Sequence, residues 1–302
     1  MSSGVTRRKL HGVLPAVLTP LDERDGIDFQ ILEKQIRYLV DAGVDGLFMA
    51  GTTAEGIFLT TEQKRDVFTL AREIAGPKLT VCLVALRPST EDVVHEMEAI
   101  ASVEPDYVAA VTPLYYGASQ QAIANHFRRI LDAAPAPFIL YNIPQNTHNV
   151  ISTETILELS EDDRVVGVKD SSGNFVEYTR GVLGNRSPGF AWIQGEDLLD
   201  APSFMLGAPG IVTGLGNVWI QPYVAMYRAA REGNTEALKE EQRRIQALAR
   251  IIYAAGGEVI PAIKTATTLL GRATPYMHIS GSTLGRETAK EIKHILKQMK
   301  LL

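Results

Sequence analysis

The chain has 302 residues, of which 45% are hydrophobic and 22% are charged, and its formal net charge is −5 at pH 7. These values are ordinary for a globular protein, and the length suits one (β/α)8 barrel of about 250 residues with an extension. The negative charge excludes the strongly basic face that nucleic-acid binding requires, and it disfavours adhesion to an anionic membrane.

The single cysteine, Cys82, excludes an internal disulfide and fits a reducing compartment. It lies in an apolar run, and we interpret it as a small buried hydrophobe. No apolar run approaches the roughly 18 residues of a membrane-spanning helix, and the N-terminal residues do not resemble a signal peptide. We therefore expect a soluble cytoplasmic protein with neither a nucleic acid nor a membrane as its partner.

Eight short apolar runs recur along the chain, and helical patterns fill most of the segments between them. We predict strands at residues 12–18, 46–50, 79–85, 107–111, 138–141, 165–168, 191–193 and 210–213. The expected helix starts are Asp28, Thr61, Ser89, Ser119 and Ser152. Alternating strands and helices predict a parallel sheet with right-handed connections, and the continuous apolarity indicates strands buried on both faces.

After Trp219 the pattern changes to helical periodicity without further strands. We predict helices at 222–231, 235–254, 259–270 and 286–299. No glycine-rich dinucleotide fingerprint follows the first strand, which disfavours an open doubly wound sheet. The sequence therefore predicts a (β/α)8 TIM barrel over residues 1–232 and a C-terminal helical extension over residues 233–302.

Active sites of such barrels lie at the C-terminal ends of the strands. The second strand is followed by Gly51, Thr52 and Thr53, whose hydroxyl and N–H groups could hold a carboxylate or simply form a turn. Tyr115 follows the fourth predicted strand, and Tyr141 is the last residue of the fifth. A phenol in such a place either packs at the edge of the core or relays protons.

Lys169 directly follows the sixth predicted strand and is the most informative residue of the sequence. Burial disfavours the charged ammonium of a lysine, and the neutral amine condenses with a ketone to form an iminium ion. The alternative is a structural ion pair with a carboxylate at the rim.

The histidines have no metal-ligand spacing, so we expect no metal and no cofactor. His148 is the one histidine near the predicted mouth. We interpret it either as a substrate contact or as a loop residue without a role in binding.

Six motifs in order along the chain resemble the dihydrodipicolinate synthase / N-acetylneuraminate lyase family, across nearly the whole sequence. The motifs are Gly51-Thr52-Thr53-Ala54-Glu55, Thr112-Pro113-Leu114-Tyr115-Tyr116, Tyr141-Asn142-Ile143-Pro144, Gly167-Val168-Lys169-Asp170, Gly195-Glu196-Asp197 and Gly210-Ile211-Val212-Thr213. The resemblance implies that Lys169 forms a Schiff base with pyruvate or another 2-oxo acid. It also implies that Tyr141 and Thr52 relay protons, and that Tyr115 crosses a subunit interface of a homotetramer built from two dimers.

The resemblance further implies that Thr53 and the backbone of Val212 bind the keto acid. Two positions depart from the family pattern. Ala54 replaces a glycine, and Asn146 stands where the synthases carry the arginine that binds the carboxylate of aspartate semialdehyde. Asn146 cannot supply a bidentate positive charge. The residues expected to face the variable end of the substrate are Gly195, Glu196, Asp197, Gln145, Asn146 and Thr213.

The sequence thus predicts a class I lyase that cleaves or forms a C–C bond between pyruvate and an aldehyde. The favoured substrate is a 2-keto-3-deoxy sugar acid or a related 4-hydroxy-2-oxo acid. The alternatives are a dihydrodipicolinate synthase, a dehydratase or deaminase that uses the same imine, and a non-catalytic 2-oxo acid sensor.

Overall fold

The structure, a computed structural model, describes residues 9–279 and 282–302 and contains an eight-stranded parallel sheet in the order β1-β8-β7-β6-β5-β4-β3-β2. The strands are β1 Gly12–Pro15, β2 Gly46–Met49, β3 Thr80–Ala85, β4 Tyr107–Val111, β5 Phe138–Asn142, β6 Val165–Asp170, β7 Ala191–Gln194 and β8 Gly210–Thr213. A bridge between Ala16 and Phe48 joins the first strand to the second and nearly closes the sheet. The predicted TIM barrel is therefore confirmed.

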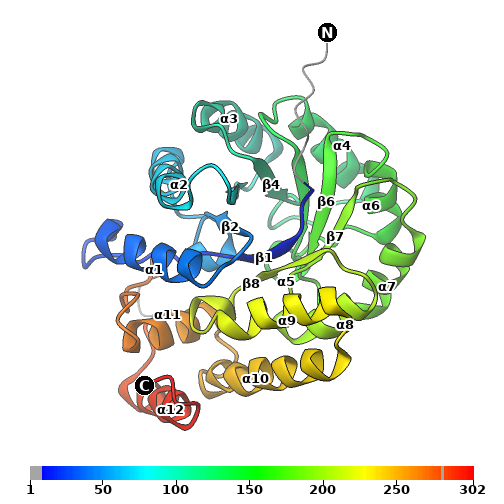
Figure 1. Cartoon of the computed structure of the whole chain (residues 1–302). Coiled ribbons are helices and arrows are strands. Elements are labelled where there is room, and N and C mark those ends of the chain that lie inside the picture. The colour runs from blue at the N-terminus through cyan, green and yellow to red at the C-terminus, as the bar shows by residue number, and fades with distance from the viewer. Residues whose placement is uncertain (1–8, 280–281) are drawn as a thin grey trace.

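Helices surround the strands and continue beyond them, as Figure 1 shows. They are α1 Phe29–Asp41, α2 Thr61–Ala75, α3 Thr90–Ile100, α4 Gln120–Leu131, α5 Pro144–Thr147, α6 Thr153–Leu159, α7 Phe175–Gly184, α8 Asp200–Met205, α9 Gln221–Glu232, α10 Thr235–Ala254, α11 Val259–Leu269 and α12 Arg286–Gln298. Asp28, Ser89, Ser119 and Ser152 are N-caps, as predicted. Thr61 is not, because Thr60 forms a capping box with Gln63.

Two strand boundaries differ from the prediction in ways that matter. The first strand ends at Pro15 rather than at residue 18, because the chain turns away from β8 to meet β2. Ala16 N–H donates to Thr213 O of β8, whereas Val17 N–H donates to Phe48 O of β2. The sixth strand is longer than predicted, so Lys169 lies within β6 rather than after it.

Two apolar cores hold the fold together. One fills the barrel interior with side chains such as Leu14, Phe48 and Ile193, and the other lies between the strands and the surrounding helices. Cys82 is fully buried in the barrel interior, as expected. Burial raises the pKa of its thiol, which makes it a poor nucleophile.

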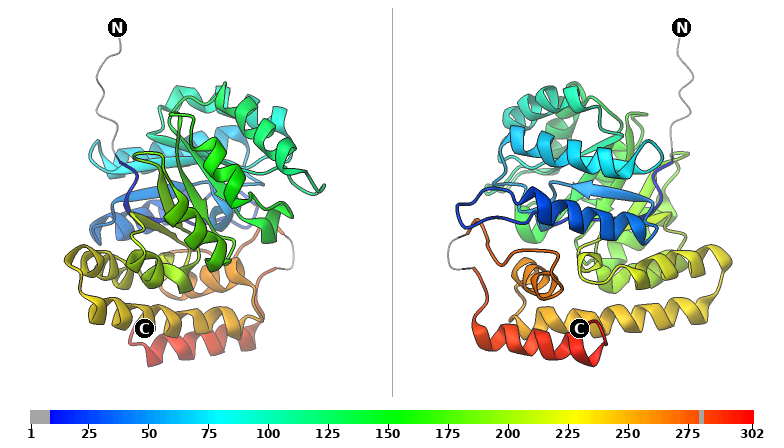
Figure 2. Two further views of the ribbon diagram at one scale, coloured as in Figure 1. Left: turned by 90° about the vertical axis from the view of Figure 1, so that its right-hand side faces the viewer. Right: turned by 60° about the vertical axis from the view of Figure 1, so that its left-hand side comes forward.

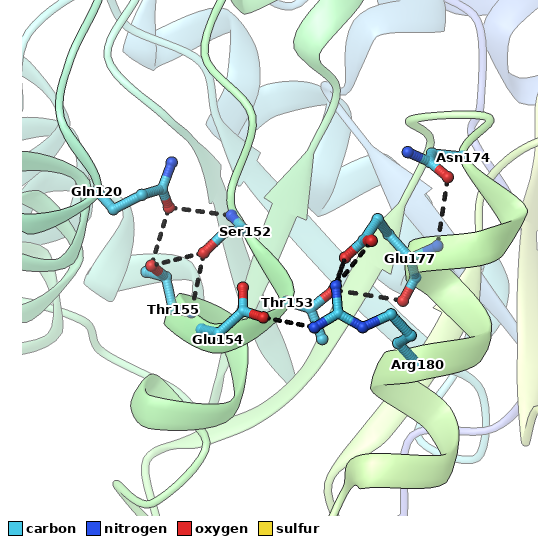
Figure 3. Close-up of polar contacts among 8 residues, drawn as sticks. All are labelled: Gln120, Ser152, Thr153, Glu154, Thr155, Asn174, Glu177 and Arg180. Atoms are coloured by element: carbon cyan, nitrogen blue, oxygen red, sulfur yellow. Dashed lines mark hydrogen bonds and ion pairs between the residues drawn. The ribbon is translucent and has the colours of Figure 1, made fainter.

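The helices that flank β5 and β6 are tied together by polar contacts (Figure 3). Gln120 at the start of α4 accepts hydrogen bonds from Ser152 N–H at 3.0 Å and from the Thr155 hydroxyl at 2.8 Å. Arg180 on α7 pairs with Glu154 on α6. Because these contacts fix α4, α6 and α7 relative to one another, they brace the two strands that carry Tyr141 and Lys169.

The C-terminal helices form a separate layer at one end of the barrel, where α10 and α12 lie side by side (Figure 2). Arg272 anchors this layer, since its buried guanidinium donates to Asn217 O and Val218 O after β8.

The predicted division between residues 232 and 233 stays a prediction. In the part of the chain that is described, no helix is long and apolar enough to cross a membrane. The cellular location also stays a prediction.

Candidate active site

Lys169 and Tyr141 are adjacent at the mouth of the barrel, because they are register partners on β6 and β5. Both side chains are buried, with exposed fractions of 4% and 1%. The Lys169 Nζ lies 3.8 Å from the ring centroid of Tyr141 and 4.8 Å from that of Phe48. The amine is therefore enclosed by two aromatic rings.

Lys169 differs from the two other lysines that are almost fully buried. Lys64 pairs with Glu96 at 2.6 Å, and Lys264 pairs with Glu55. Burial lowers the pKa of both, that of Lys64 to about 8, and their carboxylates partly oppose this effect. Lys169 forms no ion pair with any residue in the described ranges. The structural ion pair that the sequence left open is thus absent from this part of the chain.

Two hydrogen-bonded hydroxyl groups lie beside the amine. The Thr52 hydroxyl and the Tyr141 hydroxyl are 3.1 Å apart, and either oxygen can donate the hydrogen bond. Thr52 begins a short 3-10 turn, Thr52–Ala54, that follows β2. The turn is compact because Gly56 packs against it: a Cβ at Gly56 would lie 1.8 Å from Ala50 O. Only glycine fits there.

A cavity of about 510 Å³ opens above Lys169. Its polar lining comes from the strand ends, namely Thr52, Thr53, Tyr141, Gln145, Asn146, Lys169, Ser171, Gly195, Glu196 and Asp197. Its opposite wall comes from the C-terminal helices and the turn between them, namely Ala249, Ile252, Tyr253, Gly257, Glu258, Val259, Ile260 and Pro261. The cavity is thus shared between the barrel and the extension.

Gly195 lets the sixth and seventh strand ends approach each other closely. A Cβ at this position would lie 2.2 Å from Ser171 Oγ and 3.0 Å from Lys169 Cε. The Gln194 side chain holds the following segment, since its Oε1 accepts from the N–H groups of Gly195 and Glu196, both at 2.9 Å. Gly195 therefore leaves room for the Lys169 side chain.

One side of the cavity is acidic. Burial, and then the neighbouring Asp197, raise the pKa of Glu196. Burial also raises the pKa of Asp197, and hydrogen bonds from Thr213 and from the backbone of Gly214 offset part of that effect. Behind them Asp200 is 1% exposed, and its Oδ2 has no hydrogen-bond partner among the described residues. None of the described arginines lines this cavity.

Most residues predicted for the site do line this cavity, including Thr53, Val212, Gln145 and Asn146. Thr213 does not, because its side chain is fully buried and its hydroxyl donates to Asp197. His148 also lies outside the cavity, at the C-terminal end of α5.

Tyr115 lies apart from Thr52 and Tyr141 within one chain. It is 78% exposed, has a positive φ of 76° and packs edge-to-face on Tyr116. Positive φ is unusual for a tyrosine and needs support from its surroundings. Its predicted role in the relay therefore needs a second subunit.

Several residues that line the cavity or contact Lys169 were missed by sequence reasoning. Phe48 and Ser171 flank Lys169 from β2 and from the end of β6, and Ser171 could have been noticed because it follows Lys169-Asp170. Tyr253 and Glu258 come from the extension, where no local pattern distinguishes them. Among the described residues, no group of three or more His, Cys, Asp or Glu side chains is placed to hold a metal ion.

Barrel and site together define an enzyme with a buried lysine amine at the mouth of a TIM barrel. The model of the dihydrodipicolinate synthetase family matches residues 9–299. An uncharacterized DapA-like lyase of Halobacterium salinarum is 36% identical over 251 residues, which cover 82% of each chain. The 4-hydroxy-tetrahydrodipicolinate synthase of Neisseria gonorrhoeae is 30% identical over 89% of this chain and 92% of its own.

Among solved structures, dihydrodipicolinate synthase from Aquifex aeolicus superposes with a TM-score of 0.90 and 27% identity, over 97% of this chain and 99% of that one. The chain belongs to the dihydrodipicolinate synthetase family. The predictions of this family and of a lyase are confirmed.

Proposed function

We propose that Lys169 forms a Schiff base with pyruvate or a longer 2-oxo acid, and that the enzyme makes or breaks a C–C bond through this adduct. The observation that carries the proposal is a buried amine without an ion-pair partner in the described chain, beside hydrogen-bonded Tyr141 and Thr52 hydroxyls. A lysine amine that no carboxylate holds in an ion pair is available to attack a ketone carbon.

The steps follow from the positions of these groups. The Lys169 amine attacks the ketone carbon, and loss of water gives an iminium ion. In cleavage, the Tyr141 oxygen accepts the proton of the substrate's 4-hydroxyl while its own proton passes along the hydrogen bond to Thr52, and the relay later returns a proton to the enamine carbon. The C3–C4 bond breaks, its electrons pass to the iminium to form an enamine, and the aldehyde leaves. Protonation of the enamine and hydrolysis of the imine release pyruvate and restore the amine.

The carboxylate of the keto acid belongs on the turn after β2. Thr53 lines the cavity next to Thr52, and its hydroxyl and the N–H groups of the turn are suitable donors. Val212 lines the same cavity, and its backbone is the second proposed contact of the keto acid.

The remainder of the cavity favours an aldehyde that carries hydroxyl groups and no second carboxylate. Asn146 and Gln145 offer amides, whereas Glu196 and Glu258 offer carboxylates that repel an anion. A 2-keto-3-deoxy sugar acid, or a related 4-hydroxy-2-oxo acid, fits this pattern. The proposed substrate class therefore follows from the distal lining, and the proposed chemistry from Lys169.

The second candidate is synthesis of 4-hydroxy-tetrahydrodipicolinate. The family match and the relative from Neisseria gonorrhoeae favour it, because that relative carries this name. Against it stands Asn146, which supplies no positive charge for the carboxylate of aspartate semialdehyde. Condensation of pyruvate with this semialdehyde would establish the second candidate over the first.

We further propose a homotetramer composed of two dimers, in which Tyr115 completes the relay of a partner subunit. A second cavity of about 310 Å³, mostly apolar, adjoins the first and shares Thr52, Ile143 and Asn146 with it. This cavity offers an apolar surface for a phenol ring next to the Thr52 hydroxyl. Exposure of the Tyr115 ring in one chain supports such an exchange.

The test is borohydride reduction in the presence of pyruvate, followed by peptide mass spectrometry. We expect one pyruvate-derived adduct per chain on Lys169, and none in Lys169→Arg, which keeps a positive charge but supplies no reactive amine at neutral pH. An adduct that persists in Lys169→Arg, or none in the wild-type enzyme, would refute the proposal. A screen of keto-deoxy sugar acids then identifies the reaction from its product. Release of pyruvate indicates an aldolase, whereas a 2-oxo acid with the same number of carbon atoms as the substrate indicates a dehydratase.

A further inference from the structure

A buried ion pair connects the threonine turn after β2 to the C-terminal extension. Lys264 on α11 and Glu55 at the end of the turn are 1% and 5% exposed, and the Lys264 ammonium binds Glu55 Oε1. The same ammonium donates to Tyr276 O at 2.8 Å, and His278 N–H donates to Glu55 Oε2 at 2.9 Å. Both oxygens of the carboxylate are therefore held by the extension.

Glu55 needs this support because of its backbone conformation. Its φ is 55°, in the left-handed region, and Ala50 at the other end of the turn has a φ of 56°. Such conformations are unfavourable for residues with a Cβ and persist where surrounding contacts impose them. Inside the turn, Glu55 N–H donates to Thr52 O at 2.9 Å, so the position of Glu55 bears directly on Thr52.

The same helix also contributes to the cavity wall. Val259, Ile260 and Pro261 line the cavity, and Lys264 follows one turn later on α11. The pair therefore fixes the spacing between two opposite sides of the cavity. One side is the helical wall, and the other is the turn that carries Thr52 and Thr53.

We propose that Glu55 and Lys264 act as a positioning pair, through which the C-terminal extension holds Thr52 against Tyr141 and Thr53 toward the keto acid. This inference rests on the proposed function for its catalytic consequence. Neither side chain of the pair touches the reacting atoms. Loss of the pair releases the turn, which weakens binding of the keto-acid carboxylate and breaks the hydroxyl relay.

The test compares Lys264→Met with Lys64→Met in the full-length enzyme. The control is closely matched, because Lys64 is also buried, pairs with Glu96 and contacts a backbone carbonyl, that of Leu86 at 3.5 Å. Three quantities are measured: borohydride trapping of Lys169 against pyruvate concentration, solvent deuterium incorporation into the pyruvate methyl group per trapped site, and amide exchange of residues 50–58 without ligand.

We expect Lys264→Met to raise the pyruvate concentration for half-maximal trapping and to slow deuterium incorporation per adduct, each at least tenfold. Amide exchange over residues 50–58 should accelerate. Lys64→Met should lower the melting temperature but leave the three quantities within about twofold of wild type. Glu55→Gln, which keeps the volume and one acceptor oxygen, serves if Lys264→Met does not fold, and should slow deuterium incorporation in the same direction.

Equal effects of Lys264→Met and Lys64→Met would overturn the proposal, as would unchanged exchange over residues 50–58. If the wild-type enzyme traps no pyruvate, the proposed function fails by itself. The amide exchange of the free enzyme then still decides whether the pair orders the turn.

Discussion

The two walls of the cavity differ in how they are built. The strand ends of β2, β5 and β6 supply Thr52, Tyr141 and Lys169, which stand within a few ångströms of one another because parallel strands end at the same edge. The extension supplies Tyr253 and Glu258 from the end of α10 and the turn that follows it. The strand ends carry the groups proposed for the chemistry, whereas the extension supplies the opposite wall of the cavity and the residues that anchor it.

Comparison of the buried lysines in these two regions is instructive. Lys264 in the extension is neutralised by Glu55, while Lys169 at the strand ends has aromatic rings and no ion pair within the described residues. Burial alone therefore does not distinguish a reactive lysine from a structural one. The difference lies in the counter-charge, which favours the ammonium form wherever it is present.

The largest expected effect comes from the strand-end wall. Tyr141→Phe keeps the ring under Lys169 but removes the hydroxyl, so we expect turnover to fall by about 10²- to 10⁴-fold, the usual range for general acid–base catalysis. Steady-state kinetics on the best keto acid measures this effect. Tyr178→Phe is the control, because that buried hydroxyl donates to Trp192 O at 3.0 Å outside the cavity. Comparable loss in both variants would contradict the relay.

Asp200, at the start of α8 behind the acidic side of the cavity, should make the stability of the protein depend on pH. Burial raises the pKa of Asp200 well above its usual value, so its contribution to stability is full below the unfolded pKa near 4 and is lost as pH rises through the folded pKa. Asp200→Asn should remove this loss, a gain of about 1–3 kcal/mol in unfolding free energy at pH 8 relative to wild type. Urea unfolding at pH 5 and pH 8 measures it. A difference that does not grow with pH would refute the assignment.

A change at Asn146 tests whether the distal lining of the cavity selects the aldehyde, separately from the chemistry proposed for Lys169. Asn146→Arg places a positive fork in the cavity, and a charge-assisted contact is strong enough to improve kcat/KM about tenfold for aldehydes that carry a carboxylate. Polyhydroxy aldehydes should gain nothing. Pyruvate trapping on Lys169 should remain intact, since this variant leaves Thr53 and the turn after β2, the proposed carboxylate donors, unchanged. Improved use of both aldehyde classes would count against the proposed selection.

The smallest expected effect belongs to the extension wall. Glu258→Ala removes a partly exposed carboxylate at the rim of the cavity, and we expect a two- to threefold rise in KM for the hydroxylated substrate, about 0.5 kcal/mol, with kcat unchanged. Glu232→Ala, at the end of α9 and outside this cavity, is the matched control. A lower kcat in Glu258→Ala would assign the extension a part in the chemistry itself.

Much of the fold could be predicted from local patterns. All eight strands appear where continuous apolar runs predicted them, because strands buried on both faces have few polar positions. The four helices after Trp219 also appear, because their apolar positions repeat with helical spacing. The end of β1 was predicted three residues too late. The chain turns from β8 toward β2 there because Val17 pairs with Phe48, and the apolar sequence continues unchanged through this turn.

The reactive residues were predictable for a related reason. Lys169, Tyr141 and Thr52 each stand at a strand end, and a closed parallel barrel gathers such ends on one face wherever they lie in the sequence. Local sequence and that one topological rule therefore placed these residues at the mouth of the barrel but left structural roles open, and the resemblance to the family implied the catalytic roles now proposed for them. Tertiary structure alone decided the rest: Lys169 without an ion-pair partner in the described chain, Thr213 buried behind Asp197, and Lys264 bonded to Glu55 across 209 positions of sequence. Those features depend on packing between distant segments, within the barrel for Thr213 and between barrel and extension for Lys264, and such packing has no local signature.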